Sequence, residues 1–258
     1  MVGVGDLPVA LRTTDAALLA MLERRFARFI TPSAPPVFSF EITVVEHDRV
    51  NTDEDLRVDF TAGHWRVRRG DFLALWDPVS GHGTIRQTRN AYAVDAVLRI
   101  VHTLLLSSEG GFLLHASSVV RNGRAFLFTG PSGAGKTTIA RLAPGDVSVL
   151  TDEISYVRKR NDEYVAFGTP FSGDWGDVGE NVSAPVSTLF RLGWGPDNER
   201  TALDRTATVR TLMRNILFFA EDPAITGRLL DAACDFAASV PAFQLAFAPD
   251  ARVWKAIA

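Results

Sequence analysis

The sequence predicts a mixed α/β fold: an N-terminal region of antiparallel β-structure and helix, followed by a second α/β region. Two observations carry this prediction. Within residues 37–90, apolar side chains recur at every second position, which is the spacing of half-buried strands. Residues 124–142 run as an apolar strand, a glycine-rich loop and the start of a helix, an order typical of α/β domains.

The composition is that of an ordinary globular protein. The chain has 258 residues, 47% hydrophobic and 22% charged, which suits one large or two small domains. Its net charge is −3, and it has no basic stripe, so no nucleic-acid partner is expected. No apolar run reaches 18 residues and the start resembles no signal peptide, so we expect a cytoplasmic protein without a membrane span.

The first part of the chain predicts a helix and then strands. Apolar residues recur at helical spacing in Leu18, Leu19, Leu22 and Phe26, and Thr14 or Asp15 can cap this helix. Residues 37–90 predict an antiparallel meander, with runs at 38–44, 64–68, 72–76 and 82–88. A second apolar helix is predicted over 92–107, and Gly110-Gly111 ends it. The sequence thus divides into an N-terminal region, 1–110, and a second domain, 111–258.

The second domain opens with a hairpin that leads into the glycine loop. Strands over 112–120 and 124–129 are joined at Asn122-Gly123, a strong hairpin turn signal. The following residues fit the phosphate-binding (P-loop, Walker A) pattern G-x-x-x-x-G-K-[ST] from Gly130 to Thr137. In such a loop the backbone N–H groups point at phosphate oxygens, lysine neutralises the outer phosphates and the hydroxyl ligates Mg²⁺. The residues predicted to bind a nucleotide are Gly130, Ser132, Gly133, Ala134, Gly135, Lys136, Thr137 and Thr138.

Two acids follow the loop closely. A buried strand over 147–150 ends in Thr151-Asp152-Glu153, and Asp152 lies 16 residues beyond Lys136. Adjacent strand residues point to opposite faces, but at a strand end both can turn toward the loop. One carboxylate can then hold Mg²⁺ together with Thr137, while the other takes the proton of a nucleophile. Which acid does which stays open, and a merely solvated acidic strand end is the alternative.

Several histidines, three arginines and the single cysteine are further candidates for functional residues. His115 precedes the hairpin and can tune an acid of the site, or it can be an ordinary core histidine. Arg191, Arg210 and Arg214 can each reach a phosphate, but exposed arginines are usually only solvated. The remaining predictions are surface or edge positions for His47, His64 and His82, which match no metal pattern, and a buried position for Cys234.

Beyond the acids, the pattern alternates between strands and helices. Residues 154–159 and 164–167 predict a hairpin, and the Gly/Pro-rich stretch 168–176 predicts a mobile flap. Strands are predicted over 186–192 and 243–247, and helices over 209–219 and 225–240.

The order of these motifs resembles a known family. The chain resembles the catalytic domain of HPr kinase/phosphorylase and its HPr-kinase-like relatives in four successive segments. These are Leu114-His115-Ala116-Ser117, the hairpin, the loop ending in Lys136-Thr137, and Thr151-Asp152-Glu153. That group is related in fold to phosphoenolpyruvate carboxykinase. The resemblance covers residues 112–175 well, with Gly168-Thr169-Pro170-Phe171 matching a loop of the relatives, and it is loose beyond.

The resemblance implies an activity and roles for individual residues. It implies ATP-dependent phosphorylation of a serine hydroxyl, with His115 contacting the catalytic acid. Lys136 and Thr137 match the family's phosphate-binding and metal-binding residues. Asp152 matches the catalytic acid/base, and Glu153 matches a second acid that binds the metal. The family usually has Asp-Asp, so Glu153 is a departure. The signature that serves dephosphorylation is not recognised, so phosphorylase activity is not expected.

The sequence therefore predicts an ATP- and Mg²⁺-dependent kinase that acts on a hydroxyl, foremost a serine of a small protein or peptide. A nucleotide-binding ATPase switch coupled to a partner and a small-molecule kinase are the alternatives. The N-terminal region is expected to present the substrate or to form a contact in a homo-oligomer.

Overall fold

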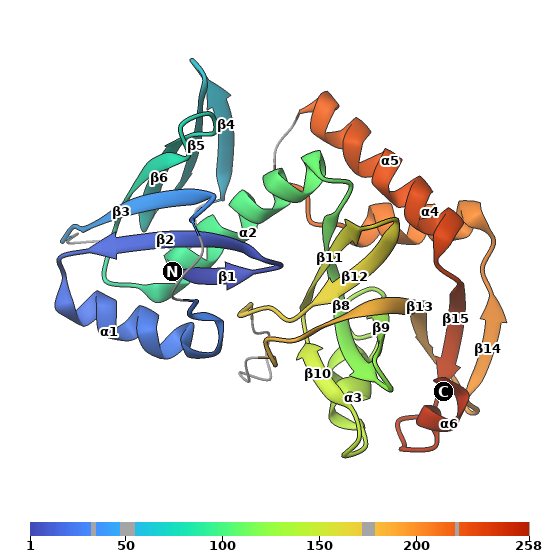
Figure 1. Cartoon of the computed structure of the whole chain (residues 1–258). Helices are drawn as coiled ribbons and strands as arrows, with labels where there is room; N and C mark the ends of the chain where they lie inside the picture. The colour runs from blue at the N-terminus through green and yellow to red at the C-terminus, as the bar shows by residue number, and fades with distance from the viewer. Residues whose placement is uncertain (32–34, 47–54, 172–178, 220–221, 258) are drawn as a thin grey trace. The chain divides into compact units, whose positions relative to one another are not determined.

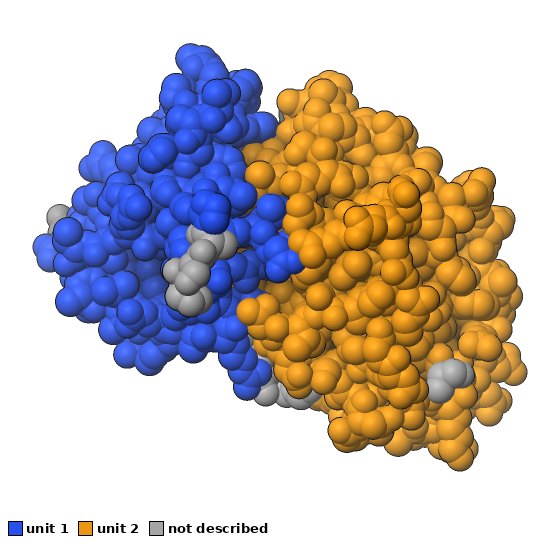
Figure 2. Space-filling model, viewed as in Figure 1, with its two compact units in different colours: residues 1–101 blue, residues 102–258 orange. Residues whose placement is uncertain are grey.

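The computed structural model describes residues 1–31, 35–46, 55–171, 179–219 and 222–257. The chain divides into two compact units, residues 1–101 and 102–258, which Figure 2 shows in two colours. Each unit contains a β-sheet, so the protein is a mixed α/β protein with two sheets. The division falls inside helix α2, Ala91–Ser108, whereas the sequence analysis placed it at residues 110–111.

In the described part of the first unit, seven strands form one sheet (Figure 1). Their order across the sheet is β1 (Val2–Val4), β2 (Leu7–Thr13), β3 (Phe38–Val44), β7 (His82–Gln87), β6 (Phe72–Asp77), β5 (His64–Arg69) and β4 (Arg57–Thr61). Strands β4 to β7 form an antiparallel meander, in which β5, β6 and β7 were predicted and β4 was not. The prediction of a wholly antiparallel region was wrong, because β3 pairs in parallel with β2 on one side and β7 on the other.

The parallel pairing follows from an N-terminal hairpin that the sequence analysis missed. Strands β1 and β2 are joined at Gly5-Asp6, where both residues have positive φ values of 60° and 59°. This is the backbone of a tight hairpin turn. Helix α1, Ala16–Arg25, then carries the chain back to β3, as parallel strands require. The predicted cap is confirmed, since the Asp15 carboxylate accepts a hydrogen bond from Leu18 N at 2.7 Å. A short 3-10 turn, η1 (Ala27–Phe29), follows α1.

Helix α2 is the predicted second helix. Within the described part of the chain, it alone is long and apolar enough to cross a membrane by length and composition. However, 67% of it is buried inside the structure. Asp95 on this helix pairs with Arg25 of α1, so its buried charge is compensated.

The second unit is built on a larger sheet. Its strands are β8 (Phe112–Arg121), β9 (Arg124–Thr129), β10 (Ser148–Thr151), β11 (Ile154–Arg160), β12 (Glu163–Phe167), β13 (Ser183–Trp194), β14 (Glu199–Ala202) and β15 (Ala242–Phe247). Strand β9 pairs antiparallel with β8 and parallel with β13. Together with the pairs β8–β11, β11–β12 and β12–β13, this closes a ring of five strands. Strands β9, β13 and β15 run parallel, so their carboxyl ends lie at one edge.

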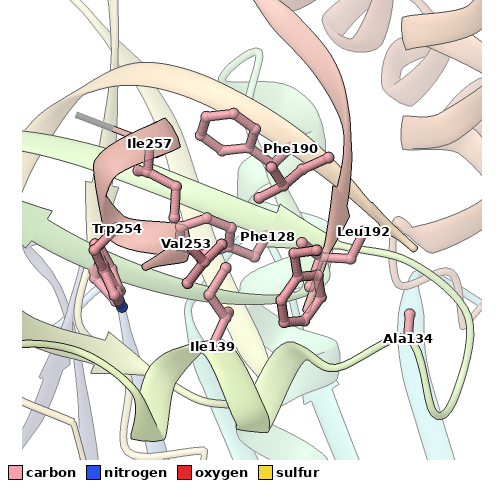
Figure 3. Packing of buried hydrophobic residues seen from close by; sticks show 11 residues of the cluster. Phe128, Ala134, Ile139, Phe190, Leu192, Val253, Trp254 and Ile257 are labelled. Atoms are coloured by element: carbon pink, nitrogen blue, oxygen red, sulfur yellow. The ribbon is translucent and has the colours of Figure 1, made fainter. Parts of the chain in front are cut away.

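Two short helices pack on one face of this sheet. Helix α3, Lys136–Arg141, follows the glycine loop, and α6, Val253–Ile257, closes the chain. Their apolar residues form one buried cluster with the sheet (Figure 3), which includes Phe128, Ala134, Ile139, Phe190, Leu192, Val253, Trp254 and Ile257. The cluster fixes the start of the loop helix against β9 and β13.

Helices α4, Arg205–Asn215, and α5, Pro223–Ser239, complete the second unit. Phe236 of α5 packs against Phe112 and Tyr164, at 5.5 and 4.9 Å between ring centroids. The prediction that Cys234 is buried was wrong, because this residue is exposed. The buried stripe of α5 is Ile225, Leu229, Ala232, Ala233 and Phe236, and position 234 falls outside it.

Most other predicted elements are present with shifted ends. Helix α4 begins four residues before the predicted start, β13 is longer than predicted, and β14 and α6 were not predicted. His64 and His82 are exposed on β5 and β7, as expected. His47 and residues 172–176 of the predicted flap lie outside the described residues.

Candidate functional site

The β8–β9 hairpin sets the position of the glycine loop. Its turn is the predicted Asn122-Gly123, with positive φ values of 52° and 72° at the two residues. The register pairs Ala116 with Thr129, so β9 ends beside His115. Thr129 Oγ1 also donates to the carbonyl oxygen of His115 at 2.9 Å. His115 is therefore adjacent to the start of the loop.

The loop itself curls tightly against two aromatic rings. Gly135, directly before α3, has a left-handed backbone with φ 101°. A Cβ atom there would lie 2.6 Å from Phe247 and 3.1 Å from Trp194, so only glycine fits without displacement. Ala134 N donates to Pro131 O at 3.1 Å, which closes a turn inside the loop.

Lys136 folds back over the loop. Its Nζ donates to the carbonyl oxygens of Gly130 and Pro131 at 3.0 and 3.1 Å. Burial lowers the pKa of this amine, and the negative charge of Glu153 partly opposes that effect. The loop thus holds a desolvated cation that an anionic ligand would stabilise.

A serine joins the hairpin to α3. Ser117 Oγ donates to the carbonyl oxygen of Lys136 at 3.0 Å, although the two residues are 19 positions apart. His115 and Ser117 are two residues apart on β8, so both side chains project from the face that carries the loop.

The two acids lie at a break between two strands rather than at a free strand end. Strands β10 and β11 both pair with the same side of β8, through Thr151 with Ser118 and Ile154 with His115. Asp152 and Glu153 occupy the two positions between these pairs. The Thr151 hydroxyl accepts from the N–H groups of Glu153 and Ile154, both at 3.2 Å, and this bends the chain.

The loop and the acids line one pocket of about 310 Å³. Its lining consists of His115, Ser132, Gly133, Gly135, Lys136, Thr137, Thr138, Asp152, Glu153 and Trp194. Both acids thus line the same pocket as the loop. Asp152 is only 4% exposed, whereas Glu153 is half-buried. Of the predicted residues, Gly130 and Ala134 are absent from this lining, and Ala134 is buried in the core cluster.

The oxygen atoms of this pocket fit a magnesium ion. Mg²⁺ prefers oxygen ligands and usually takes one or two carboxylates, with phosphates and water completing its shell. Thr137, Asp152 and Glu153 supply a hydroxyl and two carboxylates. Within the described residues, no three His, Cys, Asp or Glu side chains gather as a metal-binding group, so a cage made wholly of protein is not expected among them.

Trp194 is the pocket residue that the sequence analysis missed. Its Nε1 donates to the carbonyl oxygen of Gly133 at 2.8 Å. The available signal was a tryptophan between two glycines, Gly193-Trp194-Gly195, just after the predicted strand, which ended at residue 192. The three arginines considered above do not line the pocket, and Arg191 is hydrogen-bonded to Gln244.

Comparison with known proteins gives a family. A solved structure described as the Hpr(Ser) kinase/phosphatase from Coxiella burnetii aligns with 46% of this chain and 93% of its own, at 13% identity and a TM-score of 0.27. That score is too low to support a conclusion on fold or function. No curated protein is significantly similar in sequence. The model of the family described as SynChlorMet cassette protein ScmC matches residues 84–258, well over half of the chain. This chain therefore belongs to the family of the SynChlorMet cassette protein ScmC.

Proposed function

We propose that this protein is an ATP- and Mg²⁺-dependent kinase that transfers the γ-phosphate to a hydroxyl group, foremost a serine of a small protein or peptide. The observation that supports it most is the shared pocket of the glycine loop and the two carboxylates. A glycine loop by itself indicates only phosphate binding. The adjacent acids add the groups that phosphoryl transfer requires.

Phosphate binding is assigned to the loop. Its backbone N–H groups and Lys136 would hold the outer phosphates, and an anion there would offset the desolvation of the buried ammonium. Thr137 and Glu153 would hold Mg²⁺, which when bound neutralises charge on the phosphates. The oxygen donors of the pocket support this assignment, because they match the preference of that ion.

Proton transfer is assigned to Asp152. The acceptor hydroxyl oxygen forms a bond to the γ-phosphorus while the bond from that phosphorus to the bridging oxygen breaks, and ADP leaves. The hydroxyl proton passes to the Asp152 carboxylate. The different exposure of Asp152 and Glu153 supports separate roles, since two acids in different environments can serve different steps.

His115 is proposed to position the acid rather than to react. It lines the same pocket, and its register partner Ile154 directly follows the two acids. A cytoplasmic location, the absence of nucleic-acid and membrane partners, and a homo-oligomer contact stay predictions from the sequence.

The test is product analysis with the full chain. The protein is incubated with Mg²⁺ and ATP, with and without serine-containing peptides and small proteins as acceptors. Mass spectrometry follows the acceptor, and a coupled assay follows ADP. We expect phosphorylated acceptor and ADP in equal amounts. ADP release at the same rate with no phosphorylated acceptor would instead favour an ATPase switch, and phosphorylation of small hydroxyl compounds alone would favour a small-molecule kinase.

A further inference from the structure

We propose that the indole of Trp194 is the platform on which the base of the bound nucleotide stacks. This inference rests on the proposed function, because it extends the phosphate site of the loop to the other end of the nucleotide. It follows from the position, exposure and fixation of this side chain.

The position of Trp194 is where ligands of α/β sheets usually bind. Trp194 is the last residue of β13, and Phe247 is the last residue of the neighbouring parallel strand β15. Thr129 ends β9, on the other side of β13, and leads directly into the glycine loop. In open α/β sheets, ligands bind beyond the carboxyl ends of the parallel strands, and β9, β13 and β15 form the parallel part of this sheet. The indole therefore lies at the edge from which the loop emerges.

The surface of Trp194 is available for a flat ligand. Its ring stacks on that of Phe247, with 4.8 Å between centroids and an angle of 28° between planes. Phe247 is fully buried, whereas Trp194 is 52% exposed. Phe247 thus covers one part of the indole, and the exposed part borders the pocket that contains Lys136. A nucleobase stacked there would cover apolar surface that is otherwise in water.

The ring is also held in one orientation. Nε1 donates to Gly133 O, and the backbone of Gly135 lies against both rings. A platform that is already fixed loses little conformational entropy when it binds a ligand. Since the Nε1 hydrogen is used by the loop, we expect Trp194 to recognise the base by stacking alone. Stacking accepts any base, so Trp194 by itself should not separate ATP from GTP.

The experiment compares ligands with and without a base. Isothermal titration calorimetry measures the affinity of the full chain for Mg²⁺–ATP, Mg²⁺–GTP and Mg²⁺–tripolyphosphate. Trp194→Ala should weaken both nucleotides about tenfold or more, because base–aromatic stacking contributes on this scale. It should leave the affinity for tripolyphosphate unchanged, because tripolyphosphate has no base to stack. Trp194→Phe keeps a stacking face and should retain most of the nucleotide affinity.

The controls separate this inference from the proposed function. Phe218→Ala removes another exposed aromatic ring, 43% exposed and absent from the pocket lining, and should change no affinity. If Trp194→Ala lowered the affinities for nucleotides and for tripolyphosphate equally, the stacking proposal would be overturned, since the indole would then only stabilise the loop. An unchanged ATP affinity would overturn it as well. If the unaltered protein bound none of the three ligands, the proposed function itself would fail.

Discussion

The hydroxyl of Ser117 donates a hydrogen bond to the carbonyl oxygen of Lys136 at 3.0 Å, and so ties the strand that carries His115 to the first residue of α3. Neither residue is near the other in sequence. The bond holds β8 of the hairpin against the start of α3. Buried hydrogen bonds of this kind hold a site in one geometry more than they add stability.

Loss of this bond should affect nucleotide binding. Ser117→Ala leaves a buried carbonyl oxygen without its partner, so we expect a loss of about 1 kcal/mol in the free energy of unfolding. The KM for ATP should rise in the same variant because the loop is less fixed. Urea denaturation and steady-state kinetics measure both effects. Ser118→Ala is the matched control, since the buried Ser118 hydroxyl has no hydrogen-bond partner among the described residues. If Ser118→Ala changed stability and KM as much as Ser117→Ala, the proposed role of the Ser117–Lys136 hydrogen bond would be contradicted.

A methyl group at Gly135 should close the pocket. In Gly135→Ala the new Cβ would have to displace Phe247 or Trp194, at a residue with φ 101°. The overlap and the left-handed backbone should together cost about 2–4 kcal/mol and abolish nucleotide binding. Gly145→Ala, where no atom of the described part of the chain lies within 4 Å of the added Cβ, is the control. Calorimetric binding and thermal unfolding of the two variants give the comparison, and a Gly135→Ala protein with full ATP affinity would contradict the described loop.

His115 should matter for transfer more than for binding. Because it lines the pocket beside the acids, we expect His115→Ala to lower kcat about 10- to 100-fold while the KM for ATP changes little. His64→Ala, on an exposed strand position of the first unit, is the matched control. A rise in KM with unchanged kcat would show that His115 binds nucleotide rather than positioning the acid.

A buried histidine should make the second unit sensitive to acid. His102 is fully buried, and burial lowers its pKa to about 3 from the usual 6.5. The folded protein therefore keeps this ring neutral, while the unfolded chain binds a proton below pH 6.5. Stability should fall as pH drops from 6.5 toward 3, by about 2 kcal/mol at pH 5. Urea denaturation at pH 7 and pH 5 measures the free energy of unfolding, which should fall less between these pH values in His102→Leu than in the unaltered protein. An equal fall in both proteins would contradict the role of His102.

The features that the sequence predicted well are those that depend on neighbouring residues. The Asp15 cap, the Asn122-Gly123 turn and the short helix after Lys136 each depend on a few adjacent positions. The pocket brings together His115, Lys136, Asp152 and Glu153, which the sequence had singled out from local patterns and family resemblance.

The features that were missed depend on distant parts of the chain. The parallel pairing of β3 could not be read locally, since it arises from a hairpin and a crossover helix that precede it. Strands β10 and β11 pair with successive residues on one side of β8, and this pairing depends on residues far away in the sequence. Asp152 and Glu153 therefore lie at a bend between two strands, where the sequence predicted a strand end. Trp194 belongs to the site only because β13 and β9 are neighbours in the sheet.

The most direct test of the account is phosphate transfer by Asp152→Asn, with Glu153→Gln and Lys136→Ala beside it. The measurement is the amount of phosphorylated acceptor by mass spectrometry, together with ATP affinity by calorimetry. We predict that Asp152→Asn binds ATP like the unaltered protein but transfers no phosphate, that Glu153→Gln loses most activity and needs a higher Mg²⁺ concentration for what remains, and that Lys136→Ala binds no ATP. An Asp152→Asn protein that phosphorylates the acceptor at the full rate would contradict the central claim.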